Sequence, residues 1–115
     1  MPQVSLIGAP TDIGASRLGC RLGPQSLRVA GIAESLRQFG CEVHDAGDLD
    51  GPENPQLPPV DGYRHLPEVI EWNRAVYDAT ATELAAGRLP ILLGGDHSLA
   101  IGSISAVARH CRERG

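Results

Sequence analysis

A continuous apolar run from Leu89 to Leu93 ends directly in two glycines, Gly94 and Gly95. Strands buried on both faces have such runs, because helices cover both sides of a parallel sheet. Glycines placed directly after a strand permit backbone angles that are closed to other residues, as a sharply turning loop requires. The run therefore predicts a buried strand of a parallel sheet rather than an edge strand, followed by a tight loop.

Two further segments have strand patterns. Residues 3–7 form a short β-prone run that is cut off by Gly8, and residues 42–46 alternate polar and apolar side chains, as a half-exposed strand does. Apolar residues at helical spacing predict three helices, over residues 24–40 (about four turns), 68–86 and 99–110, the last capped by Ser98. The alternation of strand and helix predicts an α/β domain with a parallel sheet.

The segment from Asp48 to Pro67 differs from the rest because it holds five of the nine prolines. Proline at this density breaks both helices and central strands, so we expect an irregular excursion here. Eight acidic residues against the single Arg64 make residues 41–71 the most acidic part of the chain. We interpret that charge as a solvated surface rather than a cation site.

Composition excludes several classes of function. The chain has 115 residues, of which 42% are apolar and 21% charged, as in an ordinary globular domain. No apolar run approaches the roughly 20 residues of a membrane helix, and the first residues carry no basic or apolar leader, so we expect a cytoplasmic protein without a membrane partner. All ten positive charges are Arg, which excludes a Walker lysine and a Schiff-base lysine, and the net charge of −4 argues against nucleic acid as a partner.

Polar side chains that could carry chemistry follow two of the predicted strands, in residues 8–12 and 94–98. Ligands of open parallel sheets bind beyond the carboxyl ends of the strands, where loops and helix N-termini converge. Asp96 and His97 place an oxygen and a nitrogen ligand there, so His97 is a candidate metal ligand, with a hydrogen-bonded structural histidine as the alternative. Asp96 is a candidate to orient that ligand from behind or to accept hydrogen bonds from the loop.

The other candidate patterns are weaker. Residues 14–23 do not match G-x-G-x-x-G, so dinucleotide binding has no support beyond the fold class. Ser103 and Ser105 lie in a predicted helix without a G-x-S-x-G frame, which favours a packing role. The remaining histidines have no partner at ligand spacing and are predicted to be surface or loop residues, and two aromatic residues are predicted to pack the second helix: His44, His65 and His110, and Trp72 and Tyr77.

Several stretches together resemble the ureohydrolase family, and within it the arginases. They are Ile7-Gly8-Ala9-Pro10-Thr11-Asp12, Arg21-Leu22-Gly23-Pro24, Val43-His44-Asp45-Ala46-Gly47-Asp48-Leu49 and, most specifically, Leu92-Leu93-Gly94-Gly95-Asp96-His97-Ser98-Leu99-Ala100-Ile101-Gly102-Ser103. The resemblance implies a three-layer αβα fold of the arginase/deacetylase type, with residues 1–115 as the N-terminal part of one domain. It also implies the strand order 2-1-3, in which the third strand lacks its outer neighbour.

The resemblance further implies a site and a reaction. Arginases hold two Mn²⁺ ions per subunit at the carboxyl ends of the strands, and the position of His97 matches one of the ligands. A hydroxide that bridges the two metals attacks the guanidinium carbon of L-arginine and yields L-ornithine and urea. A metal is needed because guanidinium is resonance-stabilised and water at neutral pH is a poor nucleophile. A homo-oligomer, trimeric or hexameric, is implied as well.

The chain departs from the family pattern in one respect. The family's remaining metal ligands lie in an Asp-Ala-His-x-Asp motif and an Asp-x-Asp motif, and neither is present in these 115 residues. We therefore assign no catalytic and no cofactor-binding residue within this chain and expect it to be inactive alone. Three alternatives stay open: another ureohydrolase that acts on agmatine, guanidinobutyrate or formimidoglutamate, a module that binds an anion at residues 94–99, and an inert truncation product.

Overall fold

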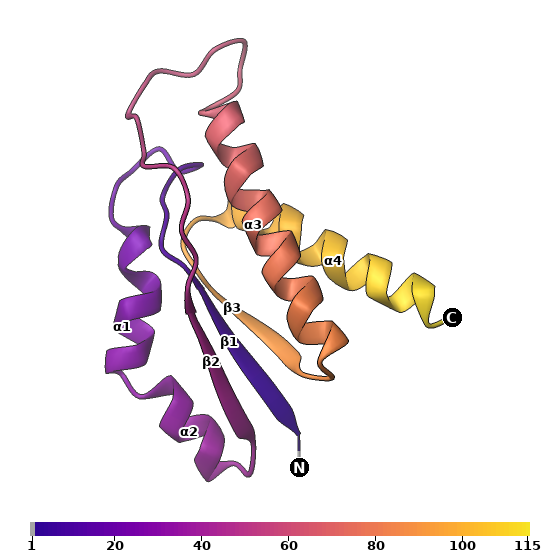
Figure 1. Ribbon diagram of the computed structural model, residues 1–115. Helices are drawn as coiled ribbons and strands as arrows, with labels where there is room; N and C mark the ends of the chain where they lie inside the picture. The colour runs from indigo at the N-terminus through magenta and orange to yellow at the C-terminus, as the bar shows by residue number, and fades with distance from the viewer. Residues whose placement is uncertain (1) are drawn as a thin grey trace.

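The computed structural model describes residues 2–115, which form a parallel three-stranded sheet with helices on both faces (Figure 1). The strands are β1 (Gln3–Ala9), β2 (Glu42–Asp48) and β3 (Leu89–Gly94). They pair in the order β2-β1-β3, so the first strand of the chain lies in the middle of the sheet. The predicted α/β class, the three-layer arrangement and the strand order implied by the resemblance are confirmed.

The central position of β1 follows from its side chains. Residues 4–9 are all buried, whereas most of β2 is exposed. Val4 lies opposite Val43 of β2 on one side and opposite Leu89 of β3 on the other. An apolar strand in the middle of a parallel sheet is covered on both faces, while a strand with alternating polar residues is tolerated at the edge.

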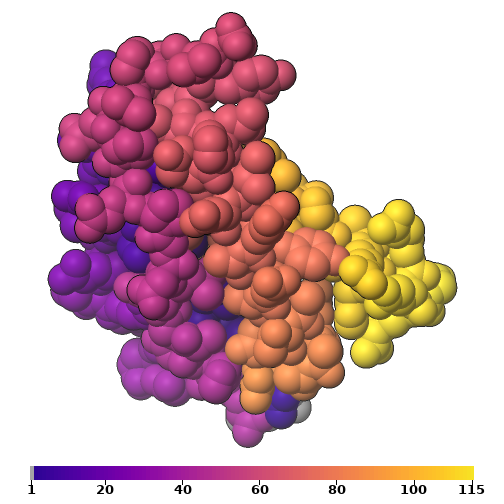
Figure 2. All heavy atoms as spheres, turned by 45° about the horizontal axis from the view of Figure 1, so that its top comes forward, coloured from indigo at the N-terminus to yellow at the C-terminus, as the bar shows by residue number. Residues whose placement is uncertain are grey.

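Four helices flank the sheet. On one face lie α1 (Gly23–Val29) and α2 (Ile32–Gln38), on the other lies α3 (Leu66–Ala85), and α4 (Ala100–Glu113) packs against α3. Single 3₁₀ turns precede two of them, η1 (Cys20–Leu22) before α1 and η2 (His97–Leu99) before α4. Figure 2 shows α4 projecting from the side of the molecule. None of these helices is both long and apolar enough to cross a membrane within the described residues.

The prediction of one continuous helix over residues 24–40 is wrong. The chain breaks at Gly31, which adopts a left-handed backbone with φ +92°, and Ala30 closes α1 through a hydrogen bond to the carbonyl of Ser26. The apolar spacing continues across the break, which is why the pattern alone does not reveal it. A glycine can take this conformation without a Cβ penalty, so α2 sets off in a new direction and reaches β2.

The hydrophobic core lies between α3 and the carboxyl end of the sheet. Trp72 and Val76 of α3 pack against Ala9 at the end of β1, together with Ile13 and Leu99 from the loops that follow β1 and β3. All five are at most 4% exposed. The core therefore holds together the two loops in which the sequence places its candidate site residues.

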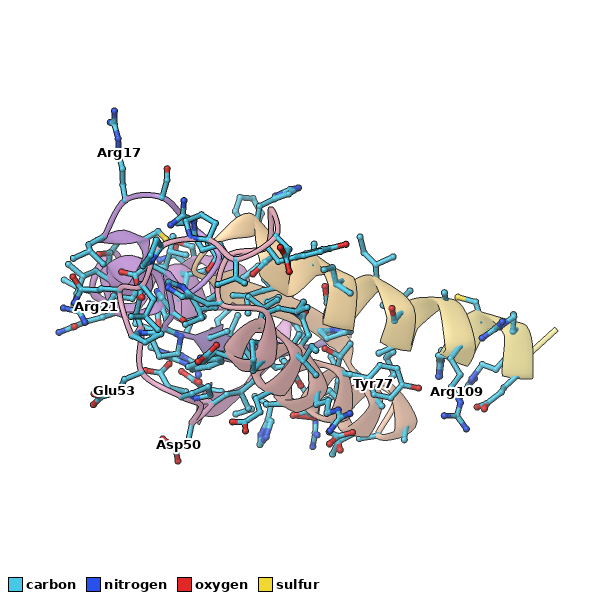
Figure 3. The ribbon with its side chains drawn as sticks, turned by 90° about the horizontal axis from the view of Figure 1, so that it is seen from above. Arg17, Arg21, Asp50, Glu53, Tyr77 and Arg109 are labelled. Carbon is cyan, nitrogen blue, oxygen red and sulfur yellow. The ribbon has the colours of Figure 1, made fainter. Side chains whose placement is uncertain are left out.

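Close approach between α3 and α4 depends on a glycine. The amide of Gly102 donates a hydrogen bond of 2.8 Å to Oδ1 of Asn73. A Cβ at position 102 would lie inside contact distance of the Asn73 backbone carbonyl and 3.1 Å from Oδ1 of the same residue. Farther along the pair, Arg109 donates to the hydroxyl of Tyr77 at 3.1 Å (Figure 3), so Tyr77 joins the two helices as well as packing α3.

The apolar pattern alone predicts that β3 is a buried strand and not an edge, and this is wrong for the described residues. The missing outer neighbour that the resemblance implies is confirmed there. β3 pairs only with β1, and among residues 2–115 no strand lies along its outer side. Leu93 is buried, but Leu89 is 63% exposed, and Ile104 of α4 is 66% exposed nearby. These elements border an apolar groove of about 360 Å³ whose lining carries no charge: Thr80, Pro90, Leu92, Ser103, Ile104, Val107 and Ala108.

We expect the 115-residue chain to self-associate at micromolar concentration through this edge, because open strand edges without charge pair with other chains. Leu89→Lys is expected to lower the associated fraction in sedimentation velocity, since a charged side chain at an edge opposes pairing. Phe39→Lys is the matched control, at an apolar residue that is 87% exposed beyond α2. A monomeric wild type whose 89–93 amides exchange only through global unfolding would show that the edge is closed in another way.

Candidate metal site

The loops after β1 and β3 meet at the carboxyl edge of the sheet (Figure 1). The amide of Asp96 donates to the carbonyl of Thr11 at 3.1 Å, and the amide of Gly95 donates to the carbonyl of Cys20 at 3.2 Å. A Cβ at Gly95 would collide with the carbonyl of Ala9, so the glycine permits this contact between the two backbones. The structure thus brings together the two segments that the sequence singles out, residues 8–12 and 94–98.

Asp96 shapes the loop after β3. Its Oδ2 accepts a hydrogen bond of 2.9 Å from the amide of Gly14, and its Oδ1 accepts one of 2.8 Å from the amide of Ser98. Asp96 is therefore the cap of the helical segment, and the prediction of Ser98 as the cap is wrong: the Ser98 hydroxyl is buried without a partner among the described residues. A carboxylate suits this place because it satisfies amides that a helix start leaves free.

His97 is the first residue of η2 and is exposed. Its imidazole makes no hydrogen bond to any residue from 2 to 115, so both ring nitrogens are free to bind a ligand. The described part of the chain contains no group of three His, Cys, Asp or Glu side chains that could hold a metal ion. At this edge of the sheet the described residues offer one imidazole, that of His97. It can serve as one ligand of a manganese site, but it cannot hold two ions by itself. Its role as a ligand stays a prediction, as does that of Asp96 behind it.

Asp12 anchors the loop after β1, a function that the sequence pattern does not reveal. The residue is 1% exposed, and its carboxylate accepts hydrogen bonds from Nδ2 of Asn54 at 2.9 Å and from the amide of Gly19 at 3.0 Å. Burial would raise the pKa of Asp12, but these hydrogen bonds and the charge of Arg21 outweigh it and lower the pKa. The carboxylate is thus ionised and ties together two loops that lie 42 residues apart.

His65 is buried, so its prediction as a surface residue is wrong, although it does lie at the end of a loop. It is 8% exposed, and its Nδ1 lies 2.8 Å from the carbonyl of Ile13. Nε2 accepts a hydrogen bond of 3.0 Å from the amide of Leu57. No spacing rule could find these contacts, because both partners are backbone groups, one of them 52 residues away.

Charged residues also surround a hollow of about 390 Å³ next to Asp12. Arg21, Asp50 and Glu53 line it, but Figure 3 shows their side chains pointing outward, away from one another. Charges that diverge in this way do not form a convergent polar site. Partial desolvation of the thiol, together with the negative charges of Asp96 and Asp12, raises the pKa of the exposed Cys20, which leaves its thiol protonated and a poor nucleophile at neutral pH.

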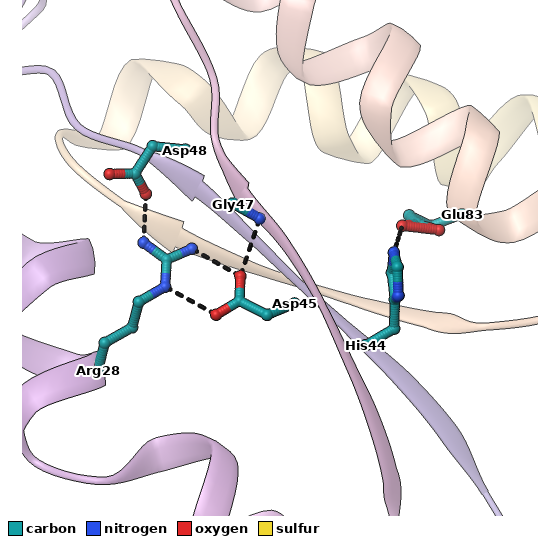
Figure 4. A network of polar contacts seen from close by, with 6 residues as sticks. All are labelled: Arg28, His44, Asp45, Gly47, Asp48 and Glu83. Atoms are coloured by element: carbon teal, nitrogen blue, oxygen red, sulfur yellow. Dashed lines mark hydrogen bonds and ion pairs between the residues drawn. The ribbon is translucent and has the colours of Figure 1, made fainter.

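An ion-pair network fixes β2 against α1 (Figure 4). Arg28 donates from Nε and Nη2 to both carboxylate oxygens of Asp45, at 3.0 and 2.9 Å, and from Nη1 to Asp48. On the other face His44, predicted to be a surface or loop residue and exposed in the structure, lies 3.6 Å from the buried carboxylate of Glu83. The hydrogen bonds from Arg28 are the main reason why the pKa of Asp45 is lowered.

The lowered pKa values of Asp12 and Asp45 lead us to expect that the protein loses stability in acid. In the unfolded chain Asp12 and Asp45 titrate near pH 4, and in the folded chain they titrate lower. Their contribution is therefore present above about pH 4 and is lost as the pH falls through the folded values. The midpoint of urea unfolding should therefore fall below pH 4. Asp45→Asn should weaken that dependence, and the exposed Asp50→Asn should not; an equally steep fall in Asp45→Asn would contradict the assignment.

The fold agrees with comparisons to known proteins. The family model of the arginase family matches residues 2–115. The arginase of Brevibacillus brevis is 36% identical over 113 residues, which cover 98% of this chain and 38% of that protein, and the arginase of Brucella melitensis is 40% identical over 111 residues, covering 96% and 36%. The chain belongs to the arginase family.

Solved structures give the same assignment. The arginase of Bacillus caldovelox superposes with a TM-score of 0.86 at 37% identity, over 96% of this chain and 38% of that one. An arginase of Entamoeba histolytica, in complex with L-ornithine, superposes with a TM-score of 0.81 at 31% identity. The chain therefore spans somewhat more than a third of the length of the relatives that it matches.

Proposed function

We propose that this chain is the N-terminal part of a manganese-dependent arginase domain that hydrolyses L-arginine to L-ornithine and urea. The relatives that match nearly the whole chain bear the name arginase, and one of the related structures holds L-ornithine. We further propose that the protein works in the cytoplasm as a homo-oligomer, trimeric or hexameric. In this account the 115 residues supply one wall of the active site, and the remaining metal ligands come from polypeptide that the relatives carry beyond this region.

The observation that carries the proposal is the placement of His97. The residue is exposed at the carboxyl edge of the sheet, its ring nitrogens are free among the described residues, and Asp96 fixes its loop through two backbone amides. Imidazole together with hard carboxylates suits Mn²⁺. When bound, the metal would activate water by lowering its pKa, which the poorly electrophilic guanidinium carbon requires. Within the chain, His97 would bind the metal and Asp96 would hold its loop.

The anion-binding alternative is disfavoured by the same geometry. The amide at the start of η2 already donates to the Asp96 carboxylate, at 2.8 Å. A second negative charge at this helix start would face that carboxylate rather than free N–H groups.

Among ureohydrolases, a structure described as a hypothetical agmatinase of Burkholderia thailandensis superposes with a TM-score of 0.69 at 23% identity, which shows a shared fold only.

The natural gene product that contains this chain provides the test. After chelation and reloading with Mn²⁺, it should release urea from L-arginine, and more slowly from agmatine and 4-guanidinobutyrate, with little formamide from formimidoglutamate. Chelation should abolish turnover. The 115-residue chain alone should release no urea at any Mn²⁺ concentration. A preference for agmatine, or turnover that survives complete metal removal, would overturn the proposal.

A further inference from the structure

One peptide unit connects the buried His65 with the loop that carries His97. The carbonyl of Ile13 lies 2.8 Å from Nδ1 of His65. The amide of the same peptide unit, that of Gly14, donates to Oδ2 of Asp96 at 2.9 Å. The two ends of a single planar group are thus held by two different loops.

The contacts around His65 define which nitrogen carries the proton. Nδ1 lies 2.8 Å from the carbonyl of Ile13, which can only accept, so Nδ1 carries a proton and donates to it. Nε2 lies 3.0 Å from the amide and 3.1 Å from the carbonyl of Leu57, and in the neutral ring it accepts from the amide. The ring is 8% exposed. The side chain of Ile13 is fully buried in the core with Leu99, two residues beyond His97. The Ile13–Gly14 peptide unit is therefore fixed in two ways, by the hydrogen bond to the Ile13 carbonyl and by the burial of the Ile13 side chain.

Asp96 passes this constraint to His97. One oxygen of the Asp96 carboxylate accepts a hydrogen bond from the amide of Gly14. The other accepts one from the amide of Ser98, the residue that follows His97. If the peptide unit turned away, Oδ2 would lose its donor and Asp96 would be free to rotate away from Ser98. Hydrogen bonds that run through one polarised peptide group also strengthen one another.

We propose that His65 is a positioning residue for the His97 loop and acts through the Ile13–Gly14 peptide and Asp96. Nothing in this chain of contacts requires a metal. The role of His65 in positioning the loop therefore does not depend on the proposed function. Only the consequence of that role for metal binding rests on the proposed function. A purely local role, in which His65 merely ties down residues 49–64, makes different predictions.

Three variants separate the two roles. His65→Asn can place an amide N–H near the position of Nδ1 and keep the bond to the Ile13 carbonyl, whereas His65→Asp cannot, and both residues tolerate the left-handed backbone at this position, φ +48°. Asn54→Ala cuts the other bond between the same loops, the one to Asp12, and leaves the Ile13–Gly14 peptide alone. Hydrogen exchange is followed amide by amide in the natural gene product without metal, with circular dichroism to confirm the fold.

His65→Asp should accelerate exchange of the Gly14 and Ser98 amides by about tenfold, which corresponds to the loss of one ordinary hydrogen bond. His65→Asn should restore most of that protection, and Asn54→Ala should change the Gly19 amide but not that of Ser98. Equal acceleration at Ser98 in Asn54→Ala, or no rescue by asparagine, would overturn the proposal.

The wild-type protein gives an independent readout should the His65→Asp variant fail to fold. Nitrogen NMR of the His65 ring should show a proton on Nδ1 and a bare Nε2. A ring whose Nδ1 carries no proton, or a Gly14 amide that exchanges as fast as a free one, would refute the relay. Either failure leaves the proposed function untouched, because urea release from arginine is measured separately.

Discussion

Replacing His97 by asparagine in the natural gene product is expected to lower kcat for arginine hydrolysis by about three orders of magnitude, which equals ~4 kcal/mol of lost transition-state stabilisation. The reason is the loss of an imidazole ligand at the carboxyl edge of the sheet, where this chain offers no replacement: the carboxylate oxygens of Asp96 already accept two backbone amides. Metal content, measured after gel filtration, should fall at one of two sites.

The control is His110→Asn, at a partly buried histidine of α4 far along the chain from the loop. It should leave both metal content and turnover unchanged. Because His97 is exposed, its substitution should also leave the free energy of unfolding of the metal-free protein within about 0.5 kcal/mol of the wild-type value. Full activity with two metals bound in His97→Asn would remove this residue from the site.

Gly102→Ala is expected to destabilise the protein by about 2 kcal/mol, although alanine is the better helix former. In an exposed helix the same change stabilises by about 1 kcal/mol. Here the new methyl group would collide with the backbone carbonyl of Asn73, which cannot move without displacing α3. Overpacking of this kind costs about 1–3 kcal/mol, and separation of the helices also breaks the Gly102–Asn73 hydrogen bond.

Urea unfolding followed by circular dichroism measures the effect. Ser105→Ala is the matched control on the same helix, since Ser105 is exposed and its hydroxyl bonds only to the carbonyl of Ile101 within α4. It should change stability by less than about 0.5 kcal/mol. An unchanged or increased midpoint for Gly102→Ala would mean that the two helices are farther apart than described.

The class of fold and the approximate bounds of the strands can be predicted from this sequence because they depend on local periodicity. The apolar run 89–93 and the alternation at 42–46 become β3 and β2, and the proline-rich excursion becomes an irregular segment with a single bridge between Val60 and Tyr63. The break at Gly31 escapes prediction, because a left-handed glycine interrupts a helix without disturbing its apolar spacing.

The site is predictable only in part. Its location after β1 and β3 follows from the rule that loops converge at the carboxyl ends of parallel strands, and the structure places both loops together. The residues that hold them, Asp12, Asn54 and His65, bind partners 42 to 52 residues away, often backbone groups, and no spacing in the sequence encodes such pairs. The apolar run at β3 also indicates burial on both sides, whereas whether a strand lies at an edge depends on its neighbours.

Manganese binding by His97 is the property on which the proposed function depends most. Anomalous diffraction at the manganese absorption edge, from crystals of the natural gene product grown with Mn²⁺, measures this directly. We predict a metal peak within bonding distance of a ring nitrogen of His97, with Asp96 still bound to the amides of Gly14 and Ser98. Metal peaks that lie elsewhere, with the His97 ring free or hydrogen-bonded only to protein, would contradict it.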